Sequence, residues 1–568
     1  MANGGSTRVA ADPAILDPAE RRQLSRLRRW GTAGALLMMV GSTSSYGAAT
    51  PIPNPVDGLR VVGLLSRIGP AALAVSYSGM GLLVLCWFLI GRLTAPGRAR
   101  RLSRSQLTHT LAMWTVPFLV TPPIFSRDVY SYLAIGAMMV HGDNPYQFGP
   151  YDTLGDTNAL AHQVDARWQH TSSPYGPAFL LVMKAVVLIS GNHVILGVLL
   201  QRVVELIGVA LIVWALPRLA RRFRIDPVSA LWLGALNPLL LFHLVAGGHN
   251  EALMIGLMLA GVEIGLSSGG RRLSRWIGGG ADPLRVVGGT VLITVAVGIK
   301  VTAAMSLAFL AIALARRAGH RWSDLFRAAA LLAVVAGATF GVLTALSGAG
   351  FGWVHALSAP GSVQSFLSIS TTLGVGAGAI GRVLGLGDHG QATIALTQPL
   401  GTVVGGCLAV LLMWRCWRQR VEPIQALGLA LGAFVLLSPV IQPWYLLWAA
   451  LPLAASTGLS RFRQVTVWLT AAFSVLIMPN GATIPVFTIV QGVVVAGAVV
   501  GVVLLALRRT GLPTASAAGN GLVHPVTLPR ASPPPPREQP DGPPPVIAVA
   551  PGELEPTQTG ADPYPRTM

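Results

Sequence analysis

Apolar stretches of about the length that crosses a lipid bilayer recur from residue 31 to residue 507 of this chain. A helix needs about 20 apolar residues to cross about 30 Å of hydrocarbon, and glycine and alanine, common in several stretches here, are typical of helices packed in a membrane. Hydrophobic residues make up 52% of the 568 residues and charged residues 11%, whereas soluble domains carry about 25% charged residues. The sequence therefore predicts an all-α, polytopic membrane bundle and excludes a single soluble core.

The apolar runs predict about 13–14 transmembrane helices. Residues 177–190 are apolar but short, and we expect them to form a juxtamembrane helix along the outer face. The two passes around Lys300 are also short, which predicts broken helices that meet at this lysine. Residues 361–386 are expected to form an external loop with a partly inserted helix. The predicted spans are 31–47, 72–92, 107–124, 194–217, 228–246, 251–267, 286–299, 301–315, 327–348, 392–414, 424–441, 444–458, 464–479 and 484–507.

The distribution of positive charge orients the chain. The formal net charge is +19, and every second connection is rich in arginine while the intervening ones hold few cations. Cytoplasmic loops carry the Lys/Arg excess, so both termini are predicted to be cytoplasmic in the plasma membrane. The charge is then a topology signal and a contact for anionic membrane lipid, and a nucleic-acid partner is not expected.

Three parts follow from this layout. Residues 1–30 form a basic cytoplasmic tail, residues 31–507 the membrane domain with an outer loop at 125–193, and residues 508–568 a Pro-rich cytoplasmic tail expected to be disordered. The three cysteines lie in or beside apolar segments, so neither a disulfide framework nor a thiolate metal cluster is expected.

Polar residues gather on the predicted outer side. Just after the span 107–124 the chain reads FSRDVYSYLAIGAMMVHGDNPY from Phe125, and an acid such as Asp128 at a membrane exit is costly and indicates a function. The other outer polar segments are SSPYGP at 172–177, GGHNE at 247–251, Lys300 and QPWY at 442–445. Solvated loop charges with no shared role would fall on both faces, so this convergence predicts a site at the outer face.

Each of these residues also has a structural alternative. Asp128 would also suit an ion pair with Arg127 or the cap of a helix. His243 and His249 would suit hydrogen-bonded positions in a bundle or, with Glu251, a metal site, although their spacing differs from H-E-x-x-H. Trp444 and Tyr445 would suit an interfacial aromatic belt.

The order of these motifs resembles the GT-C class of polytopic glycosyltransferases. Four segments, SRDVYSYLAIGAMMVHGDNPY, SSPYGP, LNPLLLFHLVAGGHNEALMIGLMLAG and SPVIQPWYLLWA, are similar to the actinobacterial polyprenol-phosphomannose-dependent α-1,6-mannosyltransferases. The resemblance runs from about residue 29 to residue 507. It implies transfer of mannose from polyprenyl-phosphate-mannose to a lipid-anchored α-1,6-mannan, the backbone of lipomannan and lipoarabinomannan in the cell wall, at the outer membrane face.

The expected mechanism is a single inverting displacement with Asp128 as general base on the acceptor hydroxyl. Cations stabilise the leaving phosphate, with Lys300 as the first candidate and Arg127 and His249 behind it. No metal and no cofactor are expected. The predicted sugar- and acceptor-binding residues are Tyr130, Tyr132, Tyr175, Asn250, Glu251, Gln442, Trp444 and Tyr445.

Two alternatives stay open at this point. Broken helices and buried cations also suit a transporter or flippase of a lipid-linked sugar, but transporters usually show paired repeats, and neither the Asp128 motif nor GGHNE has a clear second copy. A GT-C enzyme that uses another polyprenyl-phosphate sugar, such as glucose or arabinose, is equally compatible with the fold.

Overall fold

The computed structural model describes residues 14–476, with gaps at 96–97, 99, 268–281, 357–366 and 459, and a few isolated residues up to 505. The chain divides into two compact units, and all of these residues belong to the first, Met1–Val526. Nearly all of the predicted span 484–507 and the whole predicted tail 508–568 lie outside the described residues. The regular elements of the described part are helices apart from two short strands, β1 (Ala14–Ile15) and β2 (Arg100–Arg101), which pair in parallel.

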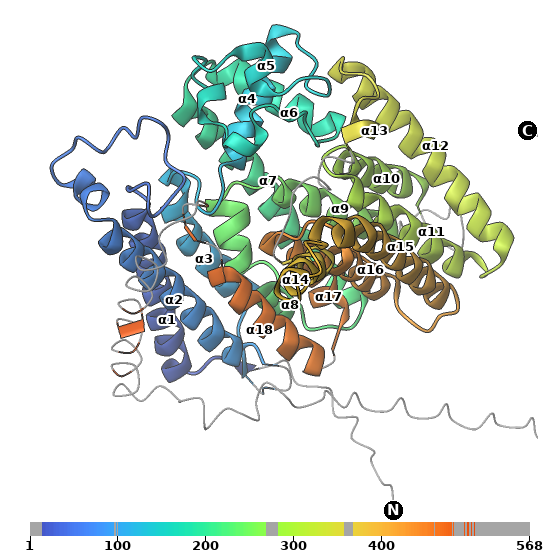
Figure 1. The fold of residues 1–568 in the computed structure, drawn as a ribbon. Coiled ribbons are helices and arrows are strands. Elements are labelled where there is room, and N and C mark those ends of the chain that lie inside the picture. The colour runs from blue at the N-terminus through green and yellow to red at the C-terminus, as the bar shows by residue number, and fades with distance from the viewer. Residues whose placement is uncertain are drawn as a thin grey trace, which may run out of the picture. The chain divides into compact units, whose positions relative to one another are not determined.

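The first three helices lie next to one another (Figure 1). They are α1 (Pro18–Gly41), α2 (Gly69–Leu93) and α3 (Arg104–Thr115), and α3 continues into the 3₁₀ turn η2 (Val116–Val120). Helix α1 begins where Asp17 and Glu20 form a capping box. The helix therefore starts inside the predicted tail 1–30 and well before the predicted span 31–47. Glycine brings α1 and α2 together, because a Cβ on Gly34 would lie 2.8 Å from the carbonyl oxygen of Gly79.

Short helices of the predicted outer loop, residues 125–193, gather at one end of this unit (Figure 1). They are α4 (Asp128–His141), α5 (Pro150–Leu154), η3 (Ala161–Gln163), η4 (Ala166–Trp168) and α6 (Pro177–Ser190). Helix α6 has the bounds predicted for the juxtamembrane helix. Helix α4 ends at Gly142, whose φ of 91° is the left-handed conformation that glycine adopts without steric cost.

The centre of the chain consists of one long helix followed by shorter helices that are separated by breaks. They are α7 (Val194–Arg222), α8 (Pro227–Leu233), the π-helix η5 (Leu240–Ala246), α9 (Glu251–Leu266), α10 (Pro283–Val297), η6 (Val301–Ala304) and α11 (Met305–Ala318). The single span predicted at 228–246 is wrong. Asn237 interrupts it, because its side chain donates to the Leu233 carbonyl and accepts from the Leu239 N–H in place of regular helix bonds. The π-helix and α9 then meet at a bend of 109°.

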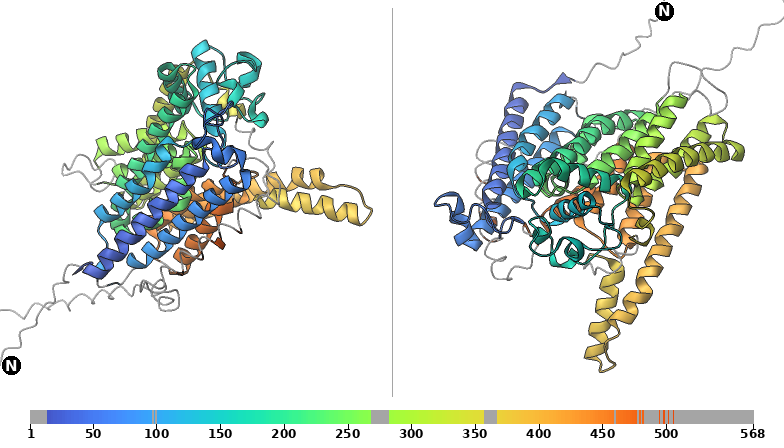
Figure 2. Two further views of the ribbon diagram at one scale, coloured as in Figure 1. Left: turned by 90° about the vertical axis from the view of Figure 1, so that its left-hand side faces the viewer. Right: turned by 90° about the horizontal axis from the view of Figure 1, so that it is seen from above.

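The last third of the chain contains long, largely exposed helices as well as short or buried ones. They are α12 (Trp322–Ser347), α13 (Trp353–Ala356), α14 (Ile369–Val383), α15 (Gly390–Trp417), α16 (Pro423–Leu437), η8 (Pro443–Tyr445), α17 (Leu446–Ser456) and α18 (Ser460–Leu476). The hairpin of α14 and α15 extends beyond its neighbours in both views of Figure 2. The predicted external loop 361–386 is described only from residue 367.

Fewer helices than predicted are long enough to cross a membrane. Among the described residues, five helices have the length and composition for it, or six if the bent pair of η5 and α9 forms one span. Helices α6, α10 and α16 are apolar but shorter. The all-α, polytopic architecture is confirmed, whereas several of the 13–14 expected spans are broken or short because backbone breaks interrupt apolar runs that look continuous in the sequence.

Candidate active site

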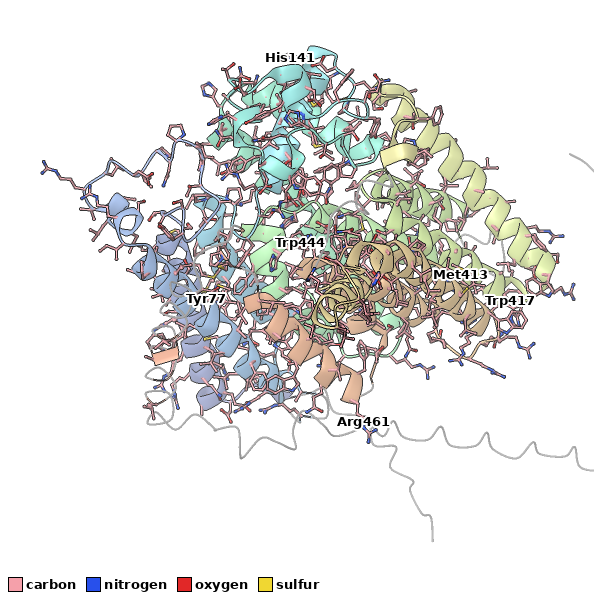
Figure 3. All side chains as sticks on the ribbon, viewed as in Figure 1. Tyr77, His141, Met413, Trp417, Trp444 and Arg461 are labelled. Carbon is pink, nitrogen blue, oxygen red and sulfur yellow. The ribbon has the colours of Figure 1, made fainter. Side chains whose placement is uncertain are left out.

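One cavity of about 1040 Å³ brings the predicted motifs together. It lies where the start of α4, the outer loop before α6, the start of α9, the break at Lys300 and the turn η8 meet. Figure 3 shows Trp444 below the outer-loop helices, at the opposite end of α4 from His141. Nine of the predicted site residues line it: Arg127, Asp128, Tyr132, Tyr175, Glu251, Lys300, Gln442, Trp444 and Tyr445.

Asp128 is the first residue of α4, and its side chain is 26% exposed. Its backbone N–H donates to Ser126 Oγ at 3.0 Å, and its Oδ2 lies 3.4 Å from Nδ1 of His249. The fully buried His249 ring stacks on Trp444, with ring centroids 3.8 Å apart. Burial raises the pKa of Asp128, but the contact and charge of His249, aided by Ser126 and Lys300, lower it more, so the pKa lies below the usual value. Asp128 is therefore a carboxylate at neutral pH.

Lys300 lies in the break between α10 and η6, with its backbone extended. Its ammonium forms an ion pair with Glu251, the first residue of α9, and lies 3.4 Å from the hydroxyl of Tyr445. The rings of Tyr445 and Trp448 are 4.5 and 5.2 Å away, within cation–π range. A lysine in an apolar stretch with no anion beside it would require a partner such as a phosphate. Glu251 is 49 positions away in sequence but adjacent in space, so desolvation alone no longer requires a phosphate.

Arg127 lines the cavity, and two of its guanidinium nitrogens donate to backbone carbonyls. Its Nε donates to the Gln163 carbonyl at 2.9 Å and its Nη1 to the Thr50 carbonyl at 3.0 Å. Its Nη2 has no hydrogen-bond partner among the described residues. The guanidinium therefore fixes the loop beside Asp128.

Three predicted site residues do not line the cavity. Tyr130 points the other way, since its buried hydroxyl donates to the Ala49 carbonyl at 2.7 Å. His249 and Asn250 are fully buried behind the wall, in the turn before α9. The placement of Tyr130 follows from the helical period, because Tyr130 and Tyr132 are two residues apart on α4 and so cannot share a face.

Other lining residues carried no motif and were missed. Trp448 lies four positions after Trp444, a spacing of about one helical turn that would have found it. Arg167 and Trp168 also line the cavity, and nothing in the loop sequence marks them. Among the residues that the structure describes, no group of three or more His, Cys, Asp or Glu could hold a metal ion.

Comparison with known proteins assigns the chain. A family model described as "Alpha-(1->6)-mannopyranosyltransferase, N-terminal domain" matches residues 28–316, and one described as "MptB C-terminal domain" matches residues 370–506. This protein belongs to the α-(1→6)-mannopyranosyltransferase family. Family membership favours the transferase over the transporter that the sequence left open.

Curated relatives match over most of their length. A probable α-(1→6)-mannopyranosyltransferase of Mycolicibacterium smegmatis is 40% identical over 90% of this chain and 92% of its own. An α-(1→6)-mannopyranosyltransferase of Mycobacterium tuberculosis is 37% identical over 88% and 90%, and the α-(1→6)-mannopyranosyltransferase B of Corynebacterium glutamicum is 35% identical over 84% and 81%. No solved structure matches the chain significantly.

Proposed function

We propose that this mannosyltransferase moves mannose from polyprenyl-phosphate-mannose to a lipid-anchored α-1,6-mannan at the outer face of the plasma membrane, with inversion at the anomeric carbon. The observation that carries the proposal is the two-sided lining of the cavity. One part of the lining, which we call the polar end, includes Asp128, Lys300 and Arg167, whereas another part, which we call the apolar end, is formed by Gly337 and Phe340 of α12, Gly401 of α15, and Phe434 and Val435 of α16.

A lipid-linked donor needs such a cavity. Its sugar and phosphate must meet an acceptor in a polar setting while its hydrocarbon chain stays out of water. Helices α12 and α15 are long and apolar enough to cross a membrane, so the apolar end of the cavity reaches helices that a bilayer would surround. A soluble nucleotide sugar has no group that would fill this end.

The chemistry assigned to the polar end is a direct displacement. Asp128 accepts the proton of the acceptor 6-hydroxyl as the oxygen forms a bond to the anomeric carbon, and the bond from that carbon to the phosphate oxygen breaks on the opposite face. The leaving group is the polyprenyl phosphate, whose charge lies near Lys300, partly neutralised by Glu251, and near Arg127. A β-linked donor gives an α-linked product.

The test uses purified protein in lipid nanodiscs with polyprenyl-phosphate-mannose and a short α-1,6-mannoside, without nucleotide sugar. We expect a mannoside one residue longer, with a new α-1,6 linkage by NMR, and the same rate with a metal chelator present. Transfer from polyprenyl-phosphate-glucose but not from the mannose donor would refute the proposed donor. A rate that falls on chelation and recovers with a divalent cation would refute the metal-free mechanism.

A further inference from the structure

We infer that the outer loop carries a preformed binding site for the acceptor mannan, made by the indole of Trp168 and the ion pair of Asp165 with Arg167. We call these three residues the acceptor shelf. The inference rests on the proposed function, because it assigns one substrate of that reaction to a place in the cavity.

The acceptor shelf lines the same cavity as Asp128, together with Thr171 and Ser172. Trp168 is only half-buried, so part of its indole is available to a ligand. A pyranose presents an apolar C–H face that packs on a flat aromatic ring, while its hydroxyl groups bond to carboxylate acceptors and guanidinium donors. The acceptor shelf provides both kinds of surface, as sugar recognition requires.

Local hydrogen bonds hold the acceptor shelf in one conformation. Asp165 begins the turn η4 by accepting from the Arg167 N–H at 3.1 Å, and its two carboxylate oxygens accept from Nε and Nη2 of Arg167 at 2.9 and 3.2 Å. The backbone N–H of Trp168 donates to the Asp165 carbonyl at 2.8 Å, and Thr171 Oγ1 donates to the Arg167 carbonyl at 3.0 Å. A surface ordered in advance loses little conformational entropy when a ligand binds.

The loop is also tied to the catalytic motif. Gln163 lies two residues before Asp165, and its carbonyl accepts from Nε of Arg127, the neighbour of Asp128. The Gln163 side chain in turn pairs with the backbone of Ile52, accepting at 2.7 Å and donating at 2.8 Å. The distance between the acceptor shelf and Asp128 is thereby fixed, which the reaction needs if a sugar on the shelf is to present its hydroxyl to the base.

The position of the acceptor shelf favours the acceptor over the donor. The apolar end of the cavity suits the donor's lipid, so the other substrate must approach from the end that opens to water. The Arg167 side chain is 64% exposed and its partner Asp165 24% exposed, which places this end at solvent. A growing mannan can leave the cavity there while its terminal residue stays at Asp128.

The experiment measures transfer to α-1,6-mannosides of two to six residues by the wild type, Trp168→Leu, Trp168→Phe and a control, Trp322→Ala. Trp322 is 53% exposed, its ring centroid lies 5.0 Å from that of Trp417, and it does not line the cavity. For the wild type, the acceptor KM should fall as the mannoside lengthens and covers the shelf. Trp168→Leu should raise the KM of the long acceptors roughly tenfold and flatten this length dependence, with the donor KM unchanged. Trp168→Phe and Trp322→Ala should behave as the wild type.

Unchanged acceptor KM values in Trp168→Leu would overturn the inference, and so would a rise in donor KM alone. The same question is answered without turnover by saturation-transfer NMR, in which the hexamannoside should receive saturation from the wild type and from Trp168→Phe but much less from Trp168→Leu. If the wild type binds the mannoside through Trp168 yet makes no product from polyprenyl-phosphate-mannose, the proposed donor is wrong and the acceptor shelf stands. If the wild type makes product and Trp168→Leu matches it, the proposed function stands and the acceptor shelf is wrong.

Discussion

The Asp128 carboxylate combines access to the cavity with a partner that keeps it charged. Its side chain is 26% exposed, while the ring beside it, His249, is fully buried and held by stacking on Trp444. A general base needs both properties, since it must touch the acceptor hydroxyl and must be unprotonated when it does so.

Replacing Asp128 with Asn should abolish most of the transfer. The amide keeps the shape of the side chain but cannot accept the acceptor proton, so we expect kcat to fall by roughly 10²–10⁴-fold, the usual contribution of a general base. Binding of polyprenyl-phosphate-mannose, measured by direct titration in nanodiscs, should stay near the wild-type value. Turnover at the wild-type rate would move the base to another residue, with Glu251 tested next.

The environment of Asp128 also sets a pH dependence. Its pKa lies below the usual value of about 3.9, so activity should be flat near neutral pH and fall only when acid protonates the base. His249→Gln removes a contribution that lowers this pKa, and the acid limb of kcat/KM should therefore move to higher pH. The exposed pair of His170 with Asp152 provides the control, because His170→Gln should leave the acid limb in place. An unmoved acid limb in His249→Gln would mean that His249 does not act on Asp128.

At the scale of helices, one buried arginine holds the two breaks that carry the site. Arg202 of α7 is 2% exposed and donates to four backbone carbonyls. Two of them, Leu119 and Thr121, lie just before the Asp128 motif, and two, Val245 and Ala246, end the π-helix before His249. Helix breaks inside a membrane protein leave carbonyls without intrahelical donors, and a neighbouring side chain can satisfy them.

Arg202→Met should therefore destabilise the protein strongly. Each buried carbonyl left without a donor costs about 1–3 kcal/mol, and we expect a clear drop in the melting temperature in detergent together with a loss of transfer. Arg218→Met is the matched control on the same helix, because Arg218 is half-buried and bonds only one carbonyl in the described structure, that of Trp214. Equal melting temperatures for both variants would remove Arg202 from this role.

Helix α12 supplies a test of the proposed lipid end of the cavity. Gly337 lines the cavity, and a Cβ there would meet nothing within 4 Å, so the Phe of Gly337→Phe can project into the space without a backbone clash. We expect the KM for a long polyprenyl donor to rise severalfold and that for a donor of two isoprene units to change little. Gly341 lies one turn further along α12, has equally open surroundings and does not line the cavity. Gly341→Phe should leave both KM values unchanged, and the same result for Gly337→Phe would place the lipid elsewhere.

Over the whole molecule, the sequence could predict which segments meet but not how their side chains pair. Asp128, Lys300 and Gln442 lie in short polar segments beside apolar runs. Polar groups are costly in lipid, so such segments indicate a functional site. The pairing of Lys300 with Glu251 joins residues 49 positions apart, and no local pattern encodes it. Trp168 and Arg167 sit in an irregular loop without periodicity, so only the folded loop shows that they line the cavity. The helix breaks at Asn237 and Lys300 likewise divide apolar runs that hydropathy joins.

The orientation in the membrane is the remaining whole-molecule prediction, and it decides where the substrates meet. The basic connections indicate that residues 415–420 face the cytoplasm and the outer loop faces outward. In a variant without Cys86, Cys407 and Cys416, a cysteine at the exposed His162 should react with an impermeant maleimide on intact cells. A cysteine at the exposed Arg420 should react only after the membrane is permeabilised. The opposite pattern would turn the mouth of the cavity, with Arg167 and Trp168, toward the cytoplasm. Mannan attached to the outer leaflet could then no longer reach Asp128, and the acceptor would have to be a lipid-linked mannoside of the inner leaflet.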